Sequence, residues 1–193
     1  MIADRIKAAL RAKGYKYFAS GLWNLNIVGV RSNLSRVNYF DDRLHVLFRD
    51  HSGEERCLSF AITCDPGHYW LRNPGRVEGT AILVPGQYRG VYKIDKHRGQ
   101  YDALCQRNGK VKVYRDRNRD EQLDMDPSTI QEGYYGINIH KSGFASQTVE
   151  KWSAGCQVFQ HAHEWDIVMS LCRLSAARYG NAFTYTLLLE ADL

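Results

Sequence analysis

Residues 134–159 read YYGINIHKSGFASQTVEKWSAGCQVF, and they separate a β-rich part of the chain from a helical one. An alternating apolar run ends at His140, and a tight Ser-Ala-Gly-Cys turn follows sixteen positions later at Cys156. Spacing alone leaves three interpretations of this histidine and cysteine. They are a catalytic pair, a metal site, or two ordinary buried residues.

Apolar periodicity predicts the elements before this stretch. We expect one helix from Ile2 to about Lys13, closed by Gly14, and then strands separated by turn residues. The expected strand segments are 22–32, 36–50, 51–64, 79–94 as two pieces around Pro85-Gly86, 101–116 and 132–140. Within 101–116, the pair Asn108-Gly109 predicts the tip of a hairpin.

After the stretch, the apolar spacing changes to that of a helix. It predicts a helix from about His163 to Tyr179, which Gly180 and Asn181 can stop. A last strand is expected at 182–190, with alternate residues on one face. These residues are Phe183, Tyr185, Leu187 and Leu189. One helix, many strands, a second helix and a closing strand indicate a single β-rich α+β domain.

The composition limits the classes of protein. With 193 residues, 44% of them hydrophobic, the chain can bury one full core and is short for two. Its net charge of +5 suits an anionic partner, but the basic residues are scattered, which disfavours nucleic acid. No apolar run is long enough for a membrane span. Charges every few residues near the N-terminus are unlike a secretory signal peptide, so synthesis in the cytoplasm is expected.

The cysteine pattern predicts reduced thiols. The cysteines are five in number: Cys57, Cys64, Cys105, Cys156 and Cys172. Cys57 and Cys64 lie seven positions apart on one expected strand, so they face opposite sides and are not expected to bridge. Because there is also no CxxC pair, we expect mostly reduced thiols, with one of them reactive.

Cys156 has the local sequence of an accessible nucleophile. Gly155 lets the backbone bend sharply before the thiol, and such a turn points consecutive N–H groups outward, as an oxyanion site requires. A histidine at a rigid strand end, such as His140, can activate a cysteine by taking its proton. The opposing interpretation is that both residues are core, since free cysteine is often buried.

The two motifs GINIH and SAGC resemble the signature of the YkuD-type L,D-transpeptidases, in which an Ile-His-Gly strand end precedes Ser/Thr-His-Gly-Cys. The order of elements is similar as well, with the motif followed by a helix and a closing strand. Upstream, FAITCDPG and GTAILVPGQYRGVYKI resemble that family's strand and Thr-Pro-x-Gly-x-Phe region. The likeness covers roughly Gly136 to Leu189, and the first forty residues have no counterpart.

The resemblance implies a fold and a reaction. It implies an L,D-transpeptidase-like β-sandwich or barrel over residues 1–193, with an N-terminal helix and extension at 1–40, a catalytic core at 41–193, and one helix after the cysteine motif. The family acts on peptidoglycan stem peptides and needs no cofactor. A cysteine attacks a carbonyl next to a D-centre, and the thioacyl intermediate passes to an amine or to water.

The resemblance also implies roles for single residues. Cys156 would be the nucleophile and His140 its base. Ser153 and Gly155 match the remaining motif positions, and backbone amides around Gly155 and Cys156 would form the oxyanion site. Residues beside the motifs are the expected substrate contacts. They are Trp152, Tyr135, Asn138 and Gln157.

Four departures from the family pattern leave the exact reaction open. Ala154 replaces a histidine, Lys141 replaces a glycine, Gln157-Val158 replaces an apolar residue followed by Arg or Asn, and the spacer is slightly short. Transpeptidation, amino-acid exchange and carboxypeptidase or endopeptidase activity all stay open. Two other classes are a non-catalytic structural or wall-binding protein, which Ala154 and Gln157 favour, and a cysteine peptidase or acyltransferase on another substrate.

The expected place of action follows from the missing signal peptide. An enzyme made in the cytoplasm would reach the periplasm or the cell wall by another route. A phage lysin or virion component, or a toxin carried by a contractile secretion machine, would be delivered in this way. The delivery apparatus would then be a partner of the chain.

Two further clusters match metal sites incompletely. The start of an EF-hand calcium loop is matched by Asp116, Asn118, Asp120 and Asp124. The loop also requires a glycine and a glutamate at the positions that Glu121 and Pro127 occupy here, so we favour a solvated turn. His161 and His163 could join Cys156 and His140 around zinc, but the spacing is not a standard one. No metal is therefore expected. Either His161 or His163 could instead replace the histidine missing at Ala154.

The segment YWLRNPGR at 69–76 has two interpretations. Its Pro, Gly and aromatic residues could form a lid over the site. We favour an ordinary long loop.

Overall fold

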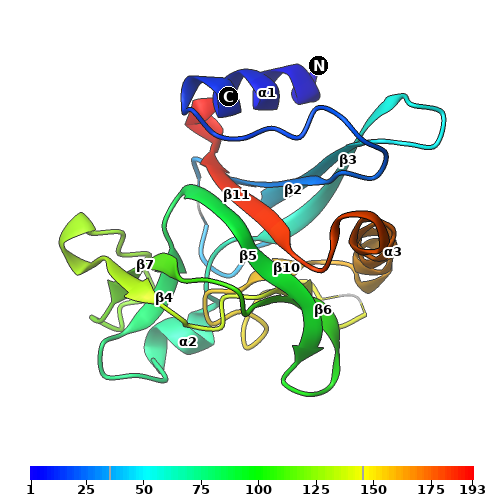
Figure 1. Cartoon of the computed structure of the whole chain (residues 1–193). Helices are drawn as coiled ribbons and strands as arrows, with labels where there is room; N and C mark the ends of the chain where they lie inside the picture. The colour runs from blue at the N-terminus through cyan, green and yellow to red at the C-terminus, as the bar shows by residue number, and fades with distance from the viewer. Residues whose placement is uncertain (35, 145) are drawn as a thin grey trace.

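The computed structural model describes residues 1–34, 36–144 and 146–193, and a closed barrel of eight strands lies at its centre (Figure 1). Around the barrel the strands run in the order β1 (Asn26–Arg31), β11 (Phe183–Leu189), β5 (Gly86–His97), β6 (Tyr101–Gln106), β9 (Ile139–Lys141), β10 (Gln157–Phe159), β3 (Glu55–Thr63) and β2 (Asp42–Arg49). A second sheet holds β4 (Thr80–Leu83), β7 (Val111–Asp116) and β8 (Gln131–Gly133). The expectation of a β-rich α+β fold is confirmed.

Within the described residues, three α-helices surround the strands: α1 (Ile2–Ala12), α2 (His68–Arg72) and α3 (Ala162–Tyr179). Two 3-10 turns add to them, η1 (Pro127–Thr129) and η2 (Glu190–Asp192). The expected first and last helices are confirmed, with Gly14 and Gly180 following them at positive φ. The short α2 was not expected, because it occupies part of the segment assigned to a loop.

The helix α1 covers one outer face of the barrel (Figure 1). Its apolar side, including Ile6 and Leu10, packs on Val28 and Val30 of β1 and on Leu188 of β11. All six residues of β1 are buried, because one face of the strand lines the barrel interior and the other meets α1. The strand β1 therefore belongs to the barrel. The expected boundary between an N-terminal extension at 1–40 and a core at 41–193 falls between β1 and β2, which pair with each other.

The expected hairpin at Asn108-Gly109 is wrong. The strands on either side of it lie in different sheets, β6 in the barrel and β7 between β4 and β8. The amides of Arg107 and Asn108 both donate to the carbonyl of Val91 in β5, which ties this turn to the barrel while the chain crosses to the second sheet. The hairpin partner of β6 is β5, and the turn between them has Arg98 and Gly99 at φ of 50° and 72°.

Two other strand expectations need correction. The segment 132–140 is not one strand, because β8 and β9 belong to different sheets and residues 134–138 connect them. In β11, the face shared by Phe183, Tyr185 and Leu187 is buried as expected, but Leu189 is exposed because it lies at the strand end.

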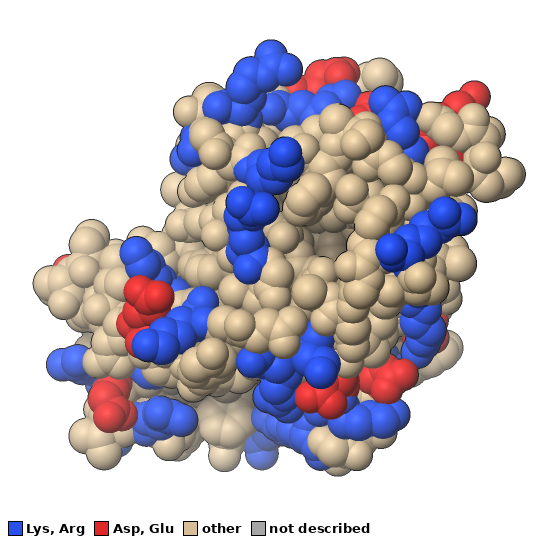
Figure 2. Space-filling view, in the orientation of Figure 1, with Lys and Arg blue, Asp and Glu red and all other residues tan. Residues whose placement is uncertain are grey.

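The surface agrees with the scattered charges of the sequence. On the face shown in Figure 2, Lys and Arg side chains are spread over the molecule, and several have acidic neighbours. Among the helices of the described residues, none has the length and apolar content needed to cross a membrane.

Candidate active site

The structure places Cys156 and His140 on neighbouring segments at one end of the barrel. The strands β9 and β10 are parallel, with Val158 opposite His140. Cys156 immediately precedes β10 and lies beside Asn138, whose amide N–H points at the cysteine sulfur over 3.4 Å. Asn138, the residue whose amide contacts the thiol, therefore lies two positions before His140 in the chain.

The hydrogen bonds of His140 define its tautomer. Its Nδ1 lies 2.8 Å from the carbonyl oxygen of Lys141, an acceptor, so Nδ1 carries the proton. The hydroxyl of Tyr101 lies 3.2 Å from the same nitrogen and donates to the same carbonyl. The other ring nitrogen, Nε2, is buried and has no hydrogen-bond partner among the described residues. His140 therefore keeps a lone pair on Nε2, as a general base requires.

A second histidine supports this arrangement. His97, at the end of β5, packs against His140 with ring centroids 4.1 Å apart and ring planes tilted by 31°. The side-chain amide nitrogen of Asn138 lies 3.1 Å from His97 Nδ1, and the amide oxygen accepts from the backbone of Gln106. Because the oxygen is engaged by an N–H, the amide nitrogen must donate to His97, which places the proton of His97 on Nε2.

Burial keeps both members of the pair neutral. It raises the pKa of the Cys156 thiol to about 11, and together with the neighbouring His97 it lowers the pKa of His140 to about 3. The thiol of Cys156 donates weakly to the carbonyl of Gly136, over 3.4 Å, and not to His140. The described contacts hold no hydrogen bond between the Cys156 thiol and His140, and the two pKa shifts favour a neutral pair over a thiolate and an imidazolium.

The turn before Cys156 depends on glycine. Gly155 has a φ of 112°, and a Cβ added there would collide with the backbone oxygen of Ala81 in β4. Ser153 is fully buried, and its hydroxyl accepts from the amide of Gly155 and donates to the carbonyl of Cys156, at 3.1 and 2.8 Å. The expected sharp turn is confirmed, with Ser153 as the residue that holds it.

The expected oxyanion site is altered by this turn. The amide of Gly155 is already used by the Ser153 hydroxyl, so it cannot point at a substrate. The backbone amide of Cys156 has no hydrogen-bond partner within the described part of the chain, which leaves it as the available donor. A single free N–H beside the thiol is a smaller oxyanion site than the sequence suggested.

The four expected substrate contacts fall into two groups. Tyr135 is half-buried under the guanidinium of Arg115, and Trp152 is exposed, so both can meet a ligand. Asn138 is buried and engaged with His97 and Gln106. Gln157 is fully buried and bonds to Tyr185 and to the backbone inside the barrel, so its side chain does not face a site that a substrate could enter.

Sequence reasoning missed His97 and Tyr101. They stand at the two ends of the β5–β6 turn, thirty-nine or more residues before His140. A histidine before an Arg-Gly turn is a weak signal, because the importance of His97 depends on the pairing of β6 with β9. That pairing joins Leu104 to Ile139 and is not visible in the sequence.

The two suspected metal clusters are held together by contacts among their own side chains. The side-chain amide of Asn118 donates to the carboxylates of Asp120 and Asp124 at 2.9 and 2.8 Å, which closes the 116–124 loop. The rings of His161 and His163 stack on each other, with centroids 5.6 Å apart, at the start of α3. No group of three or more His, Cys, Asp or Glu side chains is arranged to hold a metal within residues 1–34, 36–144 and 146–193. All five cysteines are free thiols.

Comparison with protein-family models, with curated proteins and with solved structures found no match for this chain.

Proposed function

We propose that the chain is a cysteine-dependent acyltransferase or peptidase of the L,D-transpeptidase type, acting on peptidoglycan stem peptides. The observation that carries this proposal is the state of His140, whose Nδ1 is held by a carbonyl while the buried Nε2 keeps an unused lone pair. A structural histidine would normally satisfy both nitrogens. The neighbouring Cys156 supplies a proton for that lone pair, and the motifs GINIH and SAGC supply the family likeness.

The proposed reaction starts from a neutral pair. The Cys156 side chain rotates away from Gly136, and its S–H proton passes to His140 Nε2 as the sulfur attacks the peptide carbonyl carbon. The free amide of Cys156 donates to the developing oxyanion. The C–N bond then breaks, and His140 returns the proton to the leaving amine. Because the thiol is neutral at rest, its proton must pass to His140 before or during the attack.

The thioester that results can follow two courses. Attack by an amine forms a new peptide bond, which is a cross-link or an exchange of a terminal amino acid. Attack by water releases the acid and completes a carboxypeptidase or endopeptidase cycle. In both courses His140 takes a proton from the incoming nucleophile and returns it to the Cys156 sulfur.

The proposal is tested on intact peptidoglycan. Purified protein is incubated with it, and the released and remaining muropeptides are measured by mass spectrometry. A Cys156→Ala variant should abolish any change, and a Cys57→Ala variant, which removes another half-buried thiol away from the site, should leave it intact. Loss of one residue, exchange of one residue or a new cross-link would name the reaction.

A second candidate is a non-catalytic structural or wall-binding protein on the same fold. The raised pKa of Cys156 and the alanine at position 154 favour it, because neither a reactive thiol nor a motif histidine is needed to bind a peptide. This candidate predicts unchanged muropeptides together with cosedimentation on peptidoglycan that is equal in the wild type and in Cys156→Ala.

A further inference from the structure

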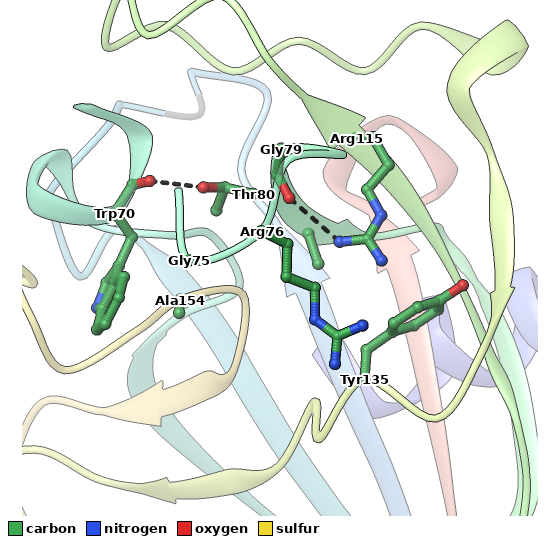
Figure 3. A pocket seen from close by; sticks show the side chains of 9 residues that line it. Trp70, Gly75, Arg76, Gly79, Thr80, Arg115, Tyr135 and Ala154 are labelled. Atoms are coloured by element: carbon green, nitrogen blue, oxygen red, sulfur yellow. Dashed lines mark hydrogen bonds between the residues drawn. The ribbon is translucent and has the colours of Figure 1, made fainter. Parts of the chain in front are cut away.

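A pocket of about 190 Å³ opens beside the turn that carries Cys156 (Figure 3). Its walls come from the loop after α2, from β4 and β7, and from the connection between β8 and β9. The side chains that matter for a ligand are Trp70, Arg76, Arg115 and Tyr135. In Figure 3 the guanidinium groups of Arg76 and Arg115 both lie next to the Tyr135 ring.

Arg115 is a buried cation without a counter-ion. It is 4% exposed, and its guanidinium donates only to neutral acceptors, the side chain of Gln131 at 2.9 Å and the carbonyl of Gly79 at 3.2 Å. No carboxylate forms an ion pair with it among the described residues. A buried charge of this kind is costly, because neutral dipoles replace its hydration only in part. An anion in the pocket would offset that cost.

The geometry of Arg115 leaves donors for such an anion. A guanidinium has five N–H donors in a planar fork, and the two bonds to Gln131 and Gly79 leave others free. The guanidinium lies 4.5 Å above the ring of Tyr135, which limits its rotation. Arg76 adds a second charge at the pocket rim, exposed and without an ion pair within the part of the chain that the structure describes.

The pocket and the nucleophile share a wall. Ala154 lines the pocket and lies two residues before Cys156. Ala81, whose carbonyl the Gly155 turn contacts, lines it too. On the other side, Tyr135 precedes Gly136, whose carbonyl accepts from the Cys156 thiol. The pocket therefore adjoins the turn that carries Cys156, although Cys156 is not one of the residues that line it.

We propose that this pocket binds a free carboxylate of the substrate peptide, with Arg115 and Arg76 as its counter-ions and Trp70 and Tyr135 against the adjoining apolar atoms. The proposal rests on the proposed function and names the feature by which the peptide is recognised. The volume of about 190 Å³ suits one small residue, since a water takes about 30 Å³. The carboxylate can be the C-terminal one or that of a neighbouring side chain.

The experiment measures binding without catalysis. A stem tetrapeptide that ends in D-Ala is titrated into the Cys156→Ala protein, and affinity is read by calorimetry. We expect Arg115→Lys and Arg76→Gln each to weaken binding about tenfold or more, the loss typical of one charge-assisted hydrogen bond. Arg178→Gln, which removes an exposed arginine in the last turn of α3, is the matched control and should bind like the parent.

Two amidated peptides identify the carboxylate. One carries a C-terminal carboxamide, and the other carries amides on its side-chain carboxyl groups. We expect one of the two to lose affinity to the same degree as Arg115→Lys. Undiminished binding of both amidated peptides, undiminished binding by both arginine variants, or no binding of the tetrapeptide at millimolar concentration would each overturn the proposal.

The outcome separates the pocket from the proposed reaction. Cysteine-dependent muropeptide changes with arginine-independent binding would support the proposed enzyme and refute the proposed carboxylate pocket. Arginine-dependent binding without any muropeptide change would support the carboxylate pocket and refute the proposed enzymatic activity.

Discussion

The imidazole of His97, the last residue of β5, lies against that of His140 in β9, with centroids 4.1 Å apart. Two rings in such contact do not both take a proton easily, because the second charge would face the first across a poorly solvated gap. Burial lowers the pKa of both histidines. The contact with His97 therefore helps to keep His140 neutral, and the same lowering of its pKa weakens His140 as a proton acceptor.

This contact predicts the behaviour of a His97→Phe variant. The phenyl ring can preserve the ring contact but carries no charge, so the pKa of His140 should rise, because His97 is one of the causes that lower it. Histidine ring titration by NMR should show His140 protonating at higher pH than in the wild type. A His163→Phe variant, whose substitution lies outside the contact between His97 and His140, should leave the His140 titration unchanged. If His97→Phe also leaves it unchanged, the coupling is refuted.

The thiol of Cys156 should react slowly at neutral pH. Because burial raises its pKa to about 11, the thiolate fraction should grow about tenfold for each pH unit from 7 to about 10. Iodoacetamide labelling of the folded protein, followed peptide by peptide by mass spectrometry, gives this rate. A rate that is already at its plateau near pH 7 would instead indicate a preformed ion pair with His140.

The buried His45 should make the fold sensitive to acid. Burial lowers its pKa from about 6.5 to about 4, so below pH 6.5 the unfolded chain binds a proton that the folded one does not. Its stabilising contribution is therefore complete above pH 6.5 and is lost as the pH falls toward 4, by at most roughly 1.4 kcal/mol per pH unit.

Urea unfolding at several pH values checks this slope. A His45→Gln variant keeps a polar group near the Ser59 hydroxyl, which lies 2.7 Å from His45 Nδ1, but does not titrate. The free energy difference between wild type and variant should shrink as the pH falls from 6.5 to 4.5. A difference that is constant over this range would contradict the buried neutral state of His45.

Gly155 should tolerate no side chain. A Gly155→Ala variant combines a positive φ with a Cβ that collides with the Ala81 carbonyl, so we expect a loss of about 3 kcal/mol or more in unfolding free energy. Gly53→Ala is the matched control, because Gly53 also has a positive φ but has open space around it. It should cost only about 1 kcal/mol. Equal losses in chemical denaturation would show that the clash at Gly155 is relieved.

Several local features can be predicted correctly from the chain alone. The helices ending near Gly14 and Gly180 follow from side-chain spacing and from glycine at positive φ, which are properties of neighbouring residues. The sharp turn at Gly155 is local in the same sense. The hairpin prediction from Asn108-Gly109 was wrong because a turn signal predicts where the chain bends and not which strands pair.

By itself, the sequence determined the first and last helices and the sharp turn at Cys156, because each depends on residues within a few positions. Only the tertiary structure decided which strands close the barrel, that His97 meets His140, that Gln157 faces the interior, and that Arg115 is buried without a counter-ion among the described residues. These depend on contacts between distant segments, whose free energies are set by burial and by charge in the folded chain.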